Sequence, residues 1–324
     1  MRTIDWVDGA VEIIDQTALP AELRVLRLTT VEELIAAIQR LAVRGAPALG
    51  VAGAFGVALA ARRHAGDLGR LSQVVREIAS ARPTAVNLAR QAQRTAARLP
   101  SGFAAVLHEA CLVRDEEIAA SEAMAARGAD LVSDLCGDRP RMLTHCNTGA
   151  LAAVAGGTAL GVVLELHRRG RLREVIASET RPLLQGARLT AWELGNAGVA
   201  FRVAVDGAGP FLMARGEIDA VIVGADRICA NGDTVNKIGT YAHALGAQRA
   251  GIPFLVVAPE STIDNATPDG TAVQIEDRRA DEVVAGLPAV NPAFDVTPHE
   301  LITAIVTDRR VIRPPVSTAE SDTR

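Results

Sequence analysis

Asp226 stands at a point in the sequence where a carboxyl group could act as an acid. It follows the aliphatic run 220–223 and two small residues, which would let a ligand approach the backbone closely. Burial behind such a run disfavours the charged carboxylate, so the group could keep its proton near neutral pH and serve as a general acid. The alternative interpretation is a helix N-cap, a position where aspartate is common.

Lys237 is the only lysine in a chain that has 33 arginines. Its ammonium is a compact point charge with three rotatable donors, whereas arginine presents a wide planar fork. A site that requires lysine often grips a phosphate or sugar oxygen in a narrow pocket. We therefore predict that Lys237 is a substrate ligand at the start of a helix over 236–250. Chance retention of one surface lysine is the alternative.

Cys146 follows the short apolar run 142–144, directly before a predicted helix. A thiol near a helix N-terminus has its thiolate stabilised, so Cys146 could take part in chemistry. An inert buried thiol is the alternative, and it is the interpretation that we give the other three cysteines, Cys111, Cys136 and Cys229. The cysteines form no CxxC pair and no zinc-ligand spacing with the six histidines, so we expect free thiols and no metal.

Two arginines precede prolines at predicted helix starts, an arrangement that suits an anion. The segment Arg44-Gly45-Ala46-Pro47 combines a guanidinium with free backbone N–H groups at a helix N-terminus, and Arg82 repeats the pattern before Pro83. Each arginine taken alone is more often a surface residue. Gln185, at the start of a further helix, could cap that helix or bind a sugar hydroxyl.

The second half of the chain alternates strand and helix patterns. The predicted strands are 142–144, 174–177, 199–203, 220–223 and 254–257. The predicted helices between them are 150–168, 185–194, 210–216 and 236–250. This alternation predicts right-handed crossovers and a parallel, doubly wound sheet. Ligands bind beyond the carboxyl ends of the strands in such sheets, so the residues after these runs are the candidate site.

The first half has a different pattern. A hairpin is predicted at Asp8-Gly9, and helices are predicted from Thr30 to Leu135. The fold class is therefore α/β, with a helical N-terminal domain followed by a Rossmann-like, doubly wound parallel sheet. We predict a β element plus helical domain over 1–136, a catalytic domain over 137–313 and a mobile tail over 314–324.

Composition excludes several classes of protein. The net charge of −4 and the pI near 5.9 imply no basic face, so we expect neither nucleic acid nor membrane as a partner. The apolar run 46–61 is short, contains Pro47 and is built of alanine and glycine, which favours a buried helix. The N-terminus has no apolar signal core. No GxGxxG is present; Gly207-Ala208-Gly209 is only a fragment, so a nicotinamide cofactor is weakly supported.

Four segments are distinctive in sequence and order: 44–50 (RGAPALG), 144–149 (THCNTG), 179–186 (ETRPLLQG) and 224–239 (GADRICANGDTVNKIG). Together they resemble the methylthioribose-1-phosphate isomerases, in the wider family of the eIF2B α/β/δ subunits. The resemblance runs from Thr3 to about Val311. It implies conversion of 5-methylthioribose 1-phosphate to 5-methylthioribulose 1-phosphate in methionine salvage, by a cytoplasmic homodimer without metal or other cofactor.

The resemblance also implies the roles of individual residues. Asp226 would be the catalytic acid and Cys146 its partner. The residues that would hold the phosphate and the sugar are Arg44, Gly45, Ala46, Arg82, Gln185, Asn236 and Lys237.

This reaction needs a proton donor, because the anomeric oxygen is locked as a phosphate ester and the ring oxygen must be protonated for the ring to open. Hydrogen then moves from C2 to C1, either as a hydride or as a proton with Cys146 as its carrier. Gly156 and Gly207 depart from the family pattern near strand ends, which leaves the sugar 5-substituent open. The alternatives are an isomerase of 5-deoxyribose 1-phosphate or ribose 1,5-bisphosphate, a non-catalytic eIF2B-like regulatory subunit and, third, an NAD-dependent oxidoreductase.

Overall fold

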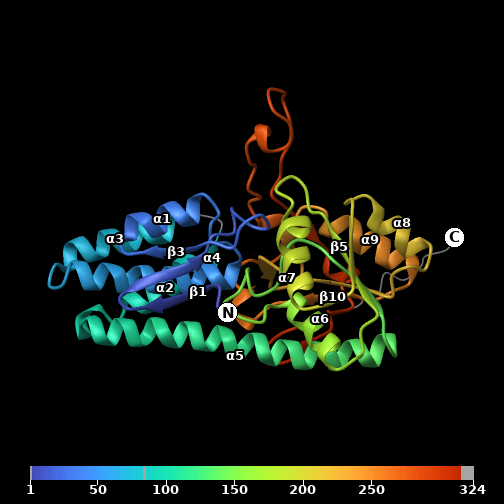
Figure 1. Cartoon of the computed structure of the whole chain (residues 1–324), viewed down its shortest axis with the longest axis horizontal. Coiled ribbons are helices and arrows are strands. Elements are labelled where there is room, and N and C mark those ends of the chain that lie inside the picture. Colours follow the sequence, from blue (N-terminus) through green and yellow to red (C-terminus); the bar gives the residue numbers. More distant parts are fainter. Residues whose placement is uncertain (1, 83–84, 315–324) are drawn as a thin grey trace.

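The computed structural model describes residues 2–82 and 85–314. Pro83, Thr84 and residues 315–324 of the predicted tail lie outside the described residues. Figure 1 shows a helical half and a sheet-containing half, with the long helix α5 (Phe103–Cys136) running along both. Within the described ranges, no helix combines the length and the apolar character that crossing a bilayer requires.

The chain begins with a three-stranded antiparallel sheet. Its strands are β1 (Ile4–Val7), β2 (Ala10–Ile14) and β3 (Val25–Leu28). Asp8 and Gly9 join the first two strands with positive φ values of 45° and 79°. Two left-handed residues make the tight turn whose twist matches a hairpin, so the predicted hairpin is confirmed.

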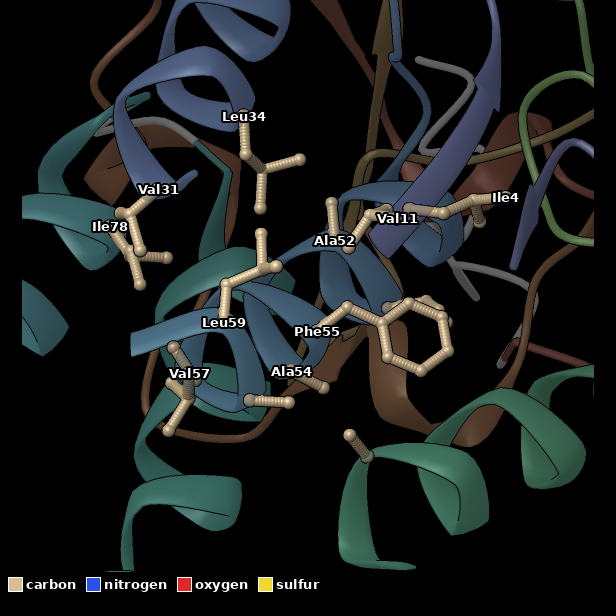
Figure 2. Close-up of a cluster of buried hydrophobic side chains, with 14 of the residues drawn as sticks. Ile4, Val11, Val31, Leu34, Ala52, Ala54, Phe55, Val57, Leu59 and Ile78 are labelled. Atoms are coloured by element: carbon tan, nitrogen blue, oxygen red, sulfur yellow. The ribbon is translucent and has the colours of Figure 1, made fainter. Parts of the chain in front are cut away.

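Helices fill the rest of the first half. They are α1 (Val31–Gln39), α2 (Ala46–Arg63), α3 (Leu68–Ser80), α4 (Val86–Ala96), the 3₁₀ turn η1 (Leu99–Ser101) and α5. Thr30 and Glu33 cap α1 reciprocally. Figure 2 shows side chains of β1, β2, α1 and α3 gathered around Phe55 and Leu59 of α2. The apolar run over 46–61 is therefore the central helix of a core, as the sequence predicts.

The second half holds a sheet of order β14-β13-β10-β7-β4-β5-β6. Its strands are β4 (Arg141–Thr144), β5 (Glu174–Ser178), β6 (Phe201–Ala204), β7 (Ala220–Val223), β10 (Phe254–Val257), β13 (Ala304–Val306) and β14 (Val311–Ile312). All of these pairings are parallel except that of the edge strand β14. The predicted parallel sheet is confirmed.

Both faces of this sheet are covered, as a doubly wound fold requires. Ala220 and Ile222 of β7 pack in one core with α5, α6 (Ala159–Arg168) and α7 (Ala191–Asn196). Val221 and Val223 pack in another core with α8 (Ala208–Ala214) and α9 (Thr240–Ala250). The two ends of α5 enter different cores, so this helix ties the halves together; the domain boundary at residue 137 stays a prediction.

Two predicted helices differ from the expectation. The helix predicted over 150–168 begins only at Ala159, because Gly156 and Gly157 have φ values of 71° and 104°, which no right-handed helix accepts. The helix predicted over 185–194 is a π-helical turn, η2 (Gly186–Thr190), followed by α7.

The predicted helix 236–250 is wrong at its start. Asn236 and Lys237 end the strand β9 (Thr234–Lys237), and α9 begins at Thr240 after Gly239, whose φ is 106°. β9 belongs to a second sheet of order β11-β8-β9-β12. Its other strands are β8 (Arg227–Cys229), β11 (Ile263–Asp264) and β12 (Phe294–Thr297). Pairing with strands distant in sequence overrides the local helical pattern.

Short 3₁₀ turns complete the described elements. They are η3 (Glu260–Thr262), η4 (Gly270–Ala272), η5 (Ala280–Glu282) and η6 (His299–Leu301). Two of them, η4 and η5, belong to the segment between β11 and β12, part of which projects from the body of the molecule in Figure 1.

Contact between α5 and α6 depends on a glycine. A Cβ on Gly128 would overlap with Val162, which is buried in the core of the sheet domain. We expect Gly128→Ala to lower the free energy of unfolding by about 1–3 kcal/mol, the usual cost of overpacking, measured by urea denaturation. Gly69→Ala, at an exposed position in the first turn of α3, is the control, because its Cβ meets only Asp67, at 3.5 Å; a loss as large there would contradict the explanation.

Candidate active site

Strand order places Cys146 and Asp226 at one crevice. The chain runs from β4 outward through β5 and β6 and then returns to β7 on the other side of β4. Ligands bind in doubly wound sheets at such a reversal point, beyond the carboxyl ends of the two strands. Cys146 follows β4, and Asp226 follows β7, so the two side chains lie at the same crevice.

A cavity of about 70 Å³ occupies this crevice, and the helical half forms its opposite wall. The structure brings every residue that the sequence singled out into the lining of this cavity. These residues are Arg44, Gly45, Ala46, Arg82, Cys146, Gln185, Asp226, Asn236 and Lys237.

Arg44 enters the cavity from the start of α2. Gly45 has a φ of 94°, and a Cβ there would overlap with the backbone of Ala152. Only glycine therefore lets these two segments of the backbone approach so closely. Arg44 Nη1 lies 3.9 Å from Cys146 Sγ. Arg44 Nε and Nη2 are buried and, among the described residues, have no hydrogen-bond partner. Two buried N–H donors without acceptors, beside a helix N-terminus, favour an anionic ligand.

Cys146 is held in a strained backbone conformation. Its φ is 65°, which is uncommon for a residue other than glycine and is found at functional sites. Its N–H donates to Thr180 Oγ1 at 2.9 Å, and its carbonyl accepts from Thr190 Oγ1 at 2.7 Å. No helix begins directly after it, because α6 starts at Ala159, so the expected helix N-terminus is wrong. The Arg44 guanidinium supplies positive charge in its place.

Asp226 is not a helix cap, because the strand β8 follows it and its N–H donates to Val235 O at 2.9 Å. Its side chain has accessible surface, but that surface faces two cavities inside the protein, so the carboxyl group is largely shielded from bulk water. Burial therefore raises the pKa of this carboxyl group above its usual range, against the opposing charges of Lys237, Arg82 and Arg44. A carboxyl group of this kind can hold a proton for transfer.

Lys237 reaches the cavity from the end of β9. Its side chain is buried, its Nζ donates to Ala293 O at 2.7 Å, and the ammonium lies 4.5 Å from the centre of the Phe294 ring. Burial lowers the pKa of Lys237, and the neighbouring Cys146 and Asp226 side chains oppose that shift. Its position is therefore fixed by β12 rather than by a helix.

Arg82 and Arg278 add two more cations to the cavity lining. Arg82 Nη2 lies 3.9 Å from Glu276 Oε2, and burial lowers the pKa of Arg82. Arg278 also pairs with Glu276, at 2.9 Å. The sequence reasoning missed Arg278, since no motif surrounds it. Together with Arg44 and Lys237 they make four cations in the described cavity lining, against the single carboxyl group of Asp226, as expected of a site for a phosphate dianion.

Gln185 and Asn236 are the polar members of the site. Gln185 is buried, makes no capping hydrogen bond with η2, and its Oε1 has no partner among the described residues. The cap interpretation is thus excluded, which leaves a side chain available to a sugar hydroxyl. Asn236 is buried and donates from Nδ2 to Thr240 Oγ1 at 3.0 Å.

Within the described residues, one group of side chains has metal-ligand spacing, and it lies outside the cavity lining. It consists of Asp233, His299 and Glu300. Asp233 accepts hydrogen bonds from the backbone N–H groups of Gly270 and His299, at 3.0 and 2.9 Å. The carboxylate therefore holds two loops together at a place outside the cavity.

The profile of the Initiation factor 2 subunit family matches residues 42–314 of this chain. A methylthioribose-1-phosphate isomerase of Anaeromyxobacter dehalogenans is 54% identical over 94% of this chain and 91% of its own length. A 5-deoxyribose 1-phosphate isomerase of Moorella thermoacetica is 48% identical over 96% of this chain and 94% of its own length. A probable bifunctional methylthioribose-1-phosphate isomerase/methylthioribulose-1-phosphate dehydratase of Nocardia farcinica is 51% identical, and this chain spans 61% of its length.

Solved structures show the same fold. The 5-methylthioribose 1-phosphate isomerase of Pyrococcus horikoshii superposes with a TM-score of 0.89 at 40% identity, over 97% of this chain and 93% of that one. The translation initiation factor eIF-2B subunit delta of A. fulgidus superposes with a TM-score of 0.84 at 42% identity, over 97% and 96% of the two chains.

The raised pKa of Asp226 has a consequence for stability. Since the folded-state pKa lies above the unfolded one, stability is full below the unfolded pKa and is lost as pH rises through the folded pKa. Asp226→Asn cannot ionise, so we expect it to melt higher than the wild type at pH 8 and equally at pH 3.5, in thermal scans across pH. A variant that melts lower than the wild type at pH 8 would contradict this origin of the shift.

Proposed function

This chain belongs to the initiation factor 2 subunit family, and from that premise we propose that it is an aldose–ketose isomerase of methionine salvage. Its substrate would be 5-methylthioribose 1-phosphate and its product 5-methylthioribulose 1-phosphate, formed in the cytoplasm. The observation that carries the proposal is the convergence of Asp226, Cys146 and a surplus of cations in one cavity.

The phosphate would be held where the unpaired donors lie. Arg44 Nε and Nη2, the start of α2 and the Lys237 ammonium line one cavity with Arg82. A charge-assisted hydrogen bond contributes roughly 1.5–3 kcal/mol, so a few of them retain the phosphate through the reaction. The ester oxygen on C1 therefore stays in place while the ring opens.

Asp226 would start the chemistry. It transfers its proton to the ring oxygen, the bond from that oxygen to C1 breaks, and its electron pair stays on the oxygen. In the hydride route, hydrogen moves from C2 to C1 with its electron pair, and the C2 hydroxyl loses its proton to Asp226 or Cys146 as the ketone forms. In the proton route, Cys146 carries hydrogen from C2 to C1 through an enolate-like intermediate. Deuterium incorporated from solvent at C1 distinguishes the second route from the first.

The 5-substituent is the finer part of the proposal. The relative from Moorella thermoacetica bears the name 5-deoxyribose 1-phosphate isomerase, so that sugar phosphate is the second candidate substrate. Ribose 1,5-bisphosphate would need a further anion site. A non-catalytic role is the rival from another class, since the eIF-2B subunit delta of A. fulgidus has the same fold. A scaffold has no use for an acid and a thiol at one crevice.

We also propose that the chain forms a homodimer. Large apolar side chains are exposed on the packed helices α8 and α9, and Phe211 is 61% exposed. Val205, which lies between β6 and α8, is 64% exposed. Tyr241 and Leu245 of α9 are 40% and 42% exposed. Exposed large apolar residues on two packed helices are typical of contact surfaces between proteins.

The catalytic proposal is tested by incubating the protein with the three sugar phosphates and following ketose formation without added cofactor. We expect turnover of 5-methylthioribose 1-phosphate, no turnover by Asp226→Asn or Cys146→Ser with the fold intact, and mainly a higher KM for Lys237→Ala. Near-wild-type kcat in either of the first two variants would contradict their roles. No turnover of any of the three sugars by the wild type would favour the regulatory subunit.

The dimer is tested by sedimentation velocity. We expect the wild type to sediment as a dimer and Phe211→Glu to sediment as a monomer, because a buried unpaired carboxylate at an interface is costly. Leu68→Glu, at an equally exposed apolar residue (58%) in the helical half, is the control and should remain dimeric. A monomeric wild type would overturn the proposal.

A further inference from the structure

Asn147 and Glu193 form a buried pair beside the cavity to which neither the sequence motifs nor the comparisons assign a role. Asn147 directly follows Cys146 and lines the cavity, and Glu193 lies behind it on α7. Their exposed fractions are 3% and 8%. A buried carboxylate is costly unless hydrogen bonds satisfy it, so this pair needs a physical explanation.

The hydrogen bonds fix which way the Asn147 amide points. Asn147 Nδ2 donates to Glu193 Oε1 at 2.6 Å and lies 3.3 Å from Thr190 Oγ1. Leu151 N–H reaches the other carboxylate oxygen at 3.4 Å. The Thr190 hydroxyl donates its hydrogen to Cys146 O, so it can only accept from Asn147. The NH₂ group of Asn147 must therefore face Thr190 and Glu193. Burial raises the pKa of Glu193 to about 7, and the bond from Asn147 opposes that shift.

This orientation leaves the amide oxygen without a partner. Asn147 Oδ1 is buried and accepts no hydrogen bond from any described residue. It belongs to a side chain of the cavity lining, as does Gln185, whose Oε1 is also unpaired. The cations of the cavity supply donors for a phosphate, whereas these two oxygens are acceptors, and the donors that a sugar phosphate offers are its hydroxyl groups.

We propose that Asn147 is a further substrate-binding residue, whose Oδ1 accepts a hydrogen bond from a ring hydroxyl, and that Glu193 is the positioning residue that turns the amide toward it. The inference rests on the proposed sugar-phosphate substrate. Gly149 belongs to the same arrangement, because a Cβ there would overlap with both carboxylate oxygens of Glu193. The loop after Cys146 is thus pressed against the carboxylate, which passes no proton to substrate and acts only through Asn147.

The test is a double-mutant cycle with two ligands. Binding of 5-methylthioribose 1-phosphate is measured by calorimetry in the Asp226→Asn background, so that turnover does not interfere, and inorganic phosphate is the second ligand. We expect Asn147→Ala and Glu193→Gln each to weaken sugar-phosphate binding about tenfold, the usual size of one lost hydrogen bond to a buried acceptor. The double variant should bind the sugar phosphate with the same affinity as whichever single variant binds it less tightly, because both substitutions remove the same contact. Inorganic phosphate should bind no variant more weakly, since its contacts are the cations of the cavity and Glu193→Gln only removes a negative charge near Arg44.

Glu117→Gln is the matched control. Glu117 is 7% exposed, and burial raises its pKa to about 7, but it lines a different cleft, between α4, α5 and residues 259–263. Glu117→Gln should leave the affinities for both ligands unchanged. It therefore distinguishes the general effect of removing a buried carboxylate from the specific effect of removing that of Glu193. If Glu193→Gln fails to fold, a sugar phosphate lacking one ring hydroxyl completes the cycle: it should bind wild type and Asn147→Ala equally.

Three outcomes would overturn the inference. One is unchanged sugar-phosphate affinity in Asn147→Ala, and another is a loss in the double variant equal to the product of the single losses. The third is an equal loss of affinity for inorganic phosphate, which would indicate collapse of the whole site. Failure of the catalytic proposal is distinct, because it appears as a wild type that does not isomerise the sugar, whatever the variants bind.

Discussion

The unbalanced positive charge in the cavity is the constraint on which the rest of this structure depends. Lys237 is buried, and Arg44 keeps two N–H donors without an acceptor among the described residues. Holding such groups together costs free energy that packing elsewhere must offset. The same charges oppose the rise in the pKa of Asp226, so the affinity for phosphate and the proton of the acid are set by one electrostatic balance.

The scaffold fixes these groups from separate elements. Arg44 comes from the start of α2, Cys146 from the loop after β4 and Lys237 from the end of β9. Cys146 is held by two threonine hydroxyls, of which that of Thr180 belongs to a further loop. Asp206 in turn accepts the N–H of Thr180 at 2.8 Å. Each neighbour holds the next, which is how a strained backbone persists at a functional site.

The local pattern of hydrophobic residues predicted much of the fold, because it indicates which residues are buried. The aliphatic run 220–223 is buried on both faces of a parallel strand, and such strands read as continuous apolar runs. The same reasoning wrongly predicted helix over 150–158 and at Asn236. Small and polar residues there carry no hydrophobic periodicity that reports burial. There the backbone is set by positive φ at Gly156 and Gly157 and by pairing of β9 with β12.

The sequence by itself determined that Cys146 and Asp226 follow strands of a parallel sheet, because hydrophobic runs mark buried strands and such a sheet collects their carboxyl ends at one edge. Tertiary structure alone decided which partners surround them. Lys237 lies opposite Phe294 in the β9–β12 ladder, and Glu193 of α7 contacts Asn147 behind the cavity lining. Contacts between residues so far apart in the chain depend on how whole elements pack, and no local spacing encodes them.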